Sequence, residues 1–285
     1  MQVKHVVLGL AMAAVLAMSA IARAETAAES FAEGEKLLAK GEFDAALQSY
    51  ASATRADRSN PDYMQRYAMV RRVIDLRSRL EKETRQQQWE YMARALRSFY
   101  ASERLYSELL KLDEAIHQRL DSGESASMLA ETQLAMEQNA NAVQTLSSLD
   151  SGKTNAMTQL LLGIAMARNG KTDDAKRIAE QAGVSDKAEP SIAYTAARLH
   201  AATGDSTKAM ELLKACFEAT LPSQLTGLKS HAKTCPDFSA VASTSEFADV
   251  LKTESKVPES KCSGGNSCAG CPMRGKCPGS QEEKP

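Results

Sequence analysis

The chain has little excess charge of either sign. Its 285 residues contain 35 Lys and Arg against 36 Asp and Glu, which gives a formal net charge of −1. The concentrated basic surface that nucleic-acid binding needs is therefore not indicated, and we expect no nucleic-acid partner. After the first 22 residues no further stretch resembles a transmembrane segment. Charge and hydropathy therefore indicate neither a nucleic-acid-binding protein nor one with several membrane spans.

The first residues have the pattern of a secretory signal peptide. A basic start of five residues precedes an apolar run that ends at Ala22 and is too short to span a bilayer comfortably. A small-residue cleavage site, Ala-Arg-Ala, ends at Ala24. We expect residues 1–24 to be removed after Ala24, and the mature chain to be periplasmic or secreted without stable membrane insertion. An uncleaved membrane anchor is the alternative.

Strand signals are missing between Glu25 and about Lys256. This part is rich in Ala, Leu, Glu, Gln, Lys and Arg, and it has no run of alternating β-branched residues. Gly and Pro fall at intervals and not in clusters, a spacing that divides the stretch into helices of about a dozen residues joined as hairpins. We predict an all-α domain over residues 25–252.

The helical stretch contains an internal period. Small residues recur in pairs 12 positions apart: Gly34 and Ala46, Ala130 and Ala142, Gly163 and Ala175, and Ala197 and Ala209. From Ala130 on, successive pairs are separated by 33 and 34 positions, and a step of 34 back gives Leu96 and Glu108 as a weaker unit. Each such hairpin leaves an apolar face that only its neighbour can cover, which predicts a stack of repeats.

The clearest unit resembles the tetratricopeptide repeat. It has a small residue in its first helix, Gly-acid-aromatic at the turn, and Ala, aromatic and Ala in its second helix (Gly34, Gly41, Glu42, Phe43, Ala46, Tyr50 and Ala53). The resemblance covers about residues 30–220 and implies an α-solenoid of antiparallel hairpins. Its groove would dock a peptide or helix of a partner protein, and it implies no catalytic activity. The expectation is an exported scaffold or adaptor for protein–protein interaction, not an enzyme.

One segment does not follow the period. No glycine occurs between Gly41 and Gly123, and the charged stretch at about 61–86 replaces or distorts one repeat. We predict a single long helix there.

Aromatic residues and arginines gather in and after this segment, and Trp, Tyr and Arg carry most interface energy. The partner-binding candidates are Tyr63, Tyr67, Arg71, Trp89, Arg97 and Tyr100. The alternative is that the rings fill hairpin cores while the arginines face water.

The C-terminal part changes in composition. We predict a closing cap over about residues 222–252, a linker over 253–261 and a cysteine-rich tail over 262–285. The tail cysteines are Cys262, Cys268, Cys271 and Cys277. The tail has too few apolar residues for a core, so two disulfides, a zinc ion or an iron–sulfur cluster must hold it, and export favours disulfides. No cofactor other than this possible zinc is expected.

The alternative function is that of a thiol- or metal-dependent factor that works through the tail, with the repeats as its mount. The remaining cysteines, Cys216 and Cys235, are either a disulfide that joins the cap to the array or two buried thiols. The histidines at 117, 200 and 231 show no ligand spacing, and no catalytic grouping can be assembled.

Overall fold

The computed structural model describes residues 26–258. The predicted signal peptide with its cleavage site after Ala24 and the four tail cysteines, Cys262, Cys268, Cys271 and Cys277, lie outside the described residues. Within the described range the chain is helical throughout and contains no strand, so the predicted all-α fold is confirmed. No helix in this range is both long and apolar enough to cross a membrane.

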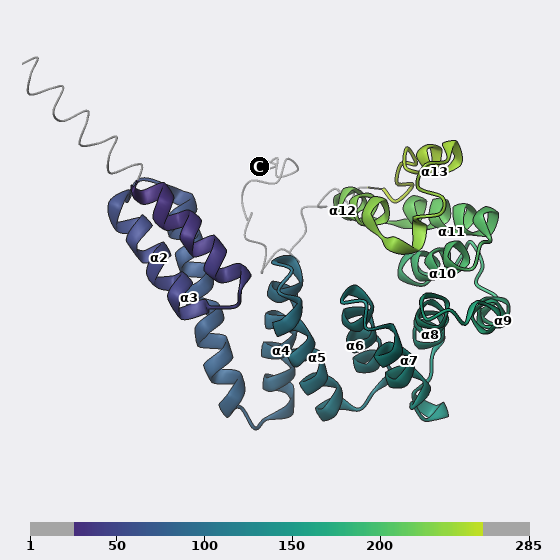
Figure 1. Cartoon of the computed structure of the whole chain (residues 1–285), viewed down its shortest axis with the longest axis horizontal. Helices are drawn as coiled ribbons and strands as arrows, with labels where there is room; N and C mark the ends of the chain where they lie inside the picture. The colour runs from purple at the N-terminus through teal and green to yellow at the C-terminus, as the bar shows by residue number, and fades with distance from the viewer. Residues whose placement is uncertain (1–25, 259–285) are drawn as a thin grey trace, which may run out of the picture. The chain divides into compact units, whose positions relative to one another are not determined.

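The helices follow one another along the chain with short connections (Figure 1). A first helix covers residues 26–39, and the others are α2 (Phe43–Ala56), α3 (Pro61–Lys82), α4 (Gln86–Ser102), α5 (Tyr106–Leu120), α6 (Gly123–Ala135), α7 (Asn139–Ser147), η1 (Ser151–Lys153), α8 (Ala156–Arg168), α9 (Thr172–Ala182), α10 (Pro190–Ala202), α11 (Ser206–Ala219), α12 (Pro222–Thr234), η2 (Pro236–Phe238) and α13 (Ser245–Val250). They form two compact units, one up to Glu137 and one from Gln138 on.

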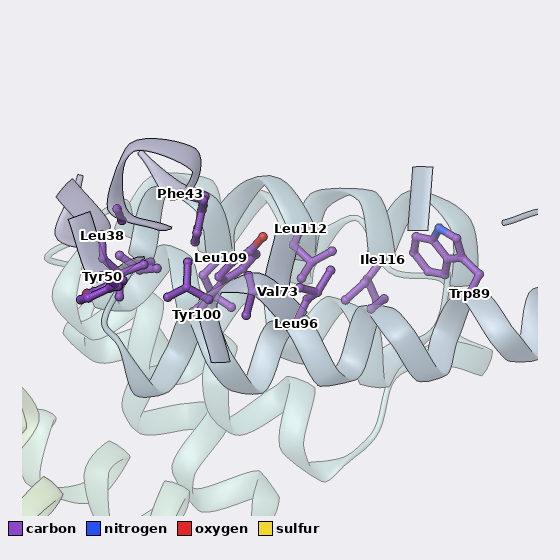
Figure 2. Close-up of a cluster of buried hydrophobic side chains, with 14 residues drawn as sticks. Leu38, Phe43, Tyr50, Val73, Trp89, Leu96, Tyr100, Leu109, Leu112 and Ile116 are labelled. Atoms are coloured by element: carbon purple, nitrogen blue, oxygen red, sulfur yellow. The ribbon is translucent and has the colours of Figure 1, made fainter. Parts of the chain in front are cut away.

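In the first unit each helix packs on the next, from α2 through α6, which is the arrangement of a solenoid. Figure 2 shows the core as a row of side chains with Leu38 and Tyr50 at one end and Trp89 at the other. Leu96 and Leu112 lie between these ends. In the second unit α8 packs on α9, α10 packs on α8 and α11, and η2 with α13 covers α10 and α11.

The turns inside the hairpins repeat with the predicted period. Gly41, Gly170 and Gly204 have φ angles of 77°, 79° and 89°, and Arg104 and Glu137 adopt the same left-handed region with φ of 56° and 59°. From Arg104 on, these residues are 33, 33 and 34 positions apart. Glycine adopts this conformation without steric cost, whereas the other two residues reach it against their preference. The backbone therefore repeats even where the sequence signal is weak.

The turn register corrects one detail of the predicted period. The small residues Gly34, Gly163 and Ala197 all lie seven positions before the turn residue, and the same offset from Arg104 gives Arg97. The weaker unit is therefore aligned on Arg97 and Leu109, one position later than the predicted Leu96 and Glu108. The predicted alignment differs because it used a step of 34 positions back from Ala130, whereas the turn residues Arg104 and Glu137 are 33 positions apart.

Two glycines are required by close helix approach. A Cβ atom on Gly34 would lie 2.6 Å from Cε1 of the buried Tyr50 ring in α2. A Cβ atom on Gly163 would lie 2.8 Å from Leu199 Cδ2 of α10 and 3.2 Å from Ile178 Cγ2 of α9. Contacts this short force the neighbour to move, so glycine at these positions sets the spacing between helices.

The segment that does not follow the period is one helix. α3 has 22 residues, begins at Pro61 and ends at Lys82, four residues before the predicted limit. The Asn60 side chain accepts a hydrogen bond from the Asp62 amide at 3.0 Å and caps its start. A single helix thus stands between the hairpin of residues 26–56 and the α4–α5 hairpin.

Candidate protein-binding surface

Two of the predicted partner-binding residues lie in the core. Trp89 is 6% exposed and Tyr100 is 3% exposed. The Arg119 guanidinium lies 4.5 Å from the centre of the Trp89 ring, and Tyr100 accepts a hydrogen bond from Arg77 at 2.9 Å. The partner role predicted for these rings is not supported, because both rings fill the core of the first unit, which is the alternative that the sequence left open.

Arg97 is also engaged within the fold. Its Nε donates to Asp113 Oδ1 at 2.8 Å, and Thr132 donates to Asp113 Oδ2 at 2.6 Å. Asp113 is completely buried, so the guanidinium supplies the opposite charge that this carboxylate needs. Where other hairpins bring helices together on Gly or Ala, this one uses an ion pair, and Arg97 is not available to a partner.

Tyr63 and Tyr67, both in α3, are half-buried. The Tyr63 ring lies 4.9 Å from the ring of Phe31 in the first helix, and Tyr67 packs against the core of the first unit. These rings attach α3 to its neighbours, and neither is fully exposed.

Arg71, the remaining candidate, is exposed on α3. Neither Arg71 nor the adjacent Arg72 has an ion-pair partner among the residues that the structure describes. Val70 and Val73 are the two fully buried residues of this helix. The exposed residues that recur at helical spacing on the opposite side form the α3 outer face: Met64, Ala68, Arg71, Arg72, Asp75, Arg79 and Lys82.

The inner side of α3 is held by paired arginines. Arg66 makes paired hydrogen bonds to Glu35 at 2.6 and 2.8 Å and to Glu103 at 2.8 and 2.7 Å. Burial alone would raise the pKa of Glu35, but hydrogen bonds from Arg66 and Tyr50 hold that pKa below its usual value. Glu35 therefore stays ionised at neutral pH.

A second inner arginine fixes the other half of α3. Arg77 donates to Glu108 Oε2 at 2.8 Å, and its guanidinium lies 4.4 Å from the centre of the Phe43 ring. The inner arginines are thus part of the fold, whereas those of the outer face are not.

Among residues 26–258, large apolar side chains that are exposed are few, and the partner-binding candidates did not include them. Tyr91 in α4 is 71% exposed and Met64 on the α3 outer face is 46% exposed. The helical period could have found Met64, since it lies in phase with Ala68 and Arg71.

A hollow of about 810 Å³ lies between the first helix and α2. Its lining is mostly polar or small, with Glu33 and Lys36 among the charged residues and Leu37 as the one large apolar residue. Glu33 lies eight residues before the turn. At the same position three of the four later hairpins bury Leu96, Leu129 and Ala196, and the fourth has the half-buried Leu162. A face that is polar where its counterparts are apolar is typical of a terminal repeat, so the hollow gives no sign of a partner.

Cys216 and Cys235 are separate thiols. Both are buried and free, and Cys216 Sγ donates to the Pro190 carbonyl at 3.1 Å. Burial raises the pKa of Cys216 to about 11 and also raises that of Cys235, where the Asp237 charge adds to the effect. The structure therefore contains two buried thiols in place of a Cys216–Cys235 disulfide, and neither forms the thiolate that nucleophilic chemistry needs.

Asp237, in η2, is the centre of a buried polar cluster in the second unit. Its two carboxylate oxygens accept from Arg168 Nε at 2.6 Å and from Arg198 Nε at 2.8 Å. Burial alone would raise the pKa of this carboxyl, but the two arginines outweigh burial and keep the pKa below its usual value. Nearby, Tyr194 Oη and His231 Nδ1 are 2.6 Å apart. The cluster fastens the closing segment to α8 and α10.

Within residues 26–258 no group of three or more His, Cys, Asp or Glu side chains is placed to hold a metal ion. The four tail cysteines, for which disulfides are expected and zinc is the alternative, lie outside this range. No protein-family model matches the chain, and no curated protein matches its sequence.

Proposed function

We propose that the chain is an exported helical-repeat scaffold or adaptor of the tetratricopeptide type, and that it binds a protein partner and does no chemistry. The observation that carries the proposal is α3, a 22-residue helix with only two fully buried residues and an outer face that the fold does not use. Protein-binding helices present such a face to a partner.

Two further features support binding over catalysis. The thiols of Cys216 and Cys235 are buried and have raised pKa values, so neither is activated as a nucleophile. The carboxylate of Asp237 is fully used by two arginines. The polar groups inside the fold thus serve its stability.

Affinity capture with the mature chain as bait tests the proposal. Proteins retained by the bait are identified by mass spectrometry and their binding is then measured with purified components. We expect at least one partner that binds the chain lacking residues 257–285 as tightly as the full mature chain. Loss of binding on this truncation would mean that the tail, and not the helical domain, binds the partner.

The tail remains the second candidate, as a thiol- or metal-dependent module. Thiol titration under denaturing conditions and metal analysis of protein from its native compartment test it. Reduced thiols with bound zinc would support the module, whereas fully oxidised and metal-free protein would contradict it.

A further inference from the structure

The α3 outer face is long enough to seat a partner segment. Met64 and Lys82 are 18 residues apart, which corresponds to about 27 Å at the helical rise of 1.5 Å per residue. An extended segment of about eight residues covers the same distance. The face therefore matches one short element of another protein.

The α3 outer face has a net positive charge. It has four basic side chains, Arg71, Arg72, Arg79 and Lys82, and one acidic side chain, Asp75, which leaves a local charge of +3 (four minus one). Asp75 pairs with Arg79 at 3.5 Å. The acidic residues Asp62 and Glu81 fall on other sides of the helix by its period.

The centre of the face combines a small residue with two exposed arginines. Ala68 has a short side chain, and Arg71 and Arg72, three and four positions later, lie to either side of it by the helical period. Guanidinium groups bind carboxylates through two parallel hydrogen bonds. The guanidinium groups of Arg71 and Arg72 have no partner among the described residues, and the small Ala68 between them permits close approach. Together they could bind the carboxylate of an aspartate or glutamate.

The composition of the face argues against an anionic membrane as its ligand. Helices that lie on membranes insert Trp, Phe or Leu between the lipids. The α3 outer face has Met64 as its one large apolar side chain. From charge, length and composition we infer that the α3 outer face docks an acidic segment of a partner protein, which rests on the proposed scaffold function and specifies its partner.

Site-specific photo-cross-linking of the full chain in its host cell tests this inference. Ala68→benzoylphenylalanine places the cross-linker at the centre of the face, Tyr91→benzoylphenylalanine samples another exposed site, and Gln224→benzoylphenylalanine on α12 is the background control. The cross-linked peptides are sequenced by mass spectrometry. We expect position 68 to capture a peptide rich in Asp and Glu.

Charge reversal supplies the second arm. In the variant Arg71→Glu with Arg72→Glu, capture at position 68 should fall at least about tenfold, because attractive contacts become repulsive. The control variant, Lys214→Glu with Lys233→Glu, changes the net charge equally at two exposed residues of the second unit and should capture as the wild type does. Circular dichroism establishes that both variants are folded.

The outcomes separate the two proposals. A neutral or basic peptide at position 68, or capture that survives the reversal, overturns the acidic partner. The chain could instead bind phosphatidylglycerol vesicles, lose that binding on charge reversal and give no cross-link to an acidic protein. That result assigns the face to lipid and also overturns the acidic partner. Capture at position 91 alone, or at neither position, overturns the role of α3, whereas the scaffold function fails only if affinity capture also retains no partner.

Discussion

α3 and the closing segment, residues 222–252, both depart from the hairpin pattern, but their charged side chains lie in different environments. In the closing segment the Asp237 carboxylate is buried and paired with Arg168 and Arg198. The neighbouring Phe238 ring lies 6.0 Å from the ring of Tyr194. α3 pairs its inner arginines and leaves Arg71 and Arg72 at the surface.

The contrast has a physical basis. A buried charge without a counter-charge is strongly unfavourable, so a charge that the fold buries must be paired within the fold. An exposed charge has no such requirement and is free to meet one on another molecule. A segment that buries its charges therefore serves stability, whereas one that exposes them is available for binding.

The largest expected effect is on the closing segment. Asp237→Asn removes the carboxylate and leaves two guanidinium groups without it, so we expect a loss of about 3–5 kcal/mol in the free energy of unfolding. Urea denaturation of the mature chain measures it. Asp249→Asn, which affects only an exposed pair with Lys252, is the control and should change stability by less than about 0.5 kcal/mol. A loss of unfolding free energy below about 1 kcal/mol for Asp237→Asn would mean that its ion pairs contribute no more than exposed ones do.

The second largest effect is expected at low pH, where protonation of Asp237 should lower the free energy of unfolding. Since the folded-state pKa of Asp237 lies below its unfolded value of about 3.9, its ion pairs stabilise the fold at neutral pH. That contribution is lost as the pH falls below about 3.9 and through the folded pKa. Unfolding free energies measured from pH 6 to pH 2 should fall more steeply for the wild type than for Asp237→Asn. Parallel curves for the two proteins would contradict the assignment.

Glycine substitution compares a regular hairpin with the closing segment. Gly34→Ala forces a methyl group into the Tyr50 ring and should cost about 1–3 kcal/mol. Gly227→Ala, in α12, meets no atom within 4 Å and should stabilise by about 0.5–1 kcal/mol through its helix propensity. Thermal unfolding of both variants measures the difference. Equal effects of one sign would mean that Gly34 does not set the helix spacing.

The smallest expected effect is on α3. Arg71→Glu with Arg72→Glu removes no ion pair that the structure describes, so the stability of the mature chain should change by less than about 0.5 kcal/mol. Differential scanning calorimetry checks this. A larger loss would show that these side chains serve the fold and would remove the contrast with Asp237.

Much of the fold could be predicted from the sequence because its determinants are local or periodic. The run of helix-forming residues fixed the all-α class, and the small residues at steps of 33 and 34 indicated the stacked hairpins. The absence of glycine after Gly41 indicated the long helix that became α3. Arg71 was selected from the sequence and lies on the exposed face, although the same reasoning selected Trp89 and Tyr100, which are buried.

Only the tertiary structure decided which charges meet. Arg168 and Arg198 are 69 and 39 positions from Asp237, and the period of 33 to 34 residues does not say which side chains of different hairpins meet. Arg97 takes a small-residue position because Asp113 lies opposite it in the adjacent helix. A helical period determines which face of a helix a residue occupies, whereas the partner of that face depends on which helices pack together. The sequence by itself therefore determined the repeated hairpins, and the packing determined which arginines remain at the surface.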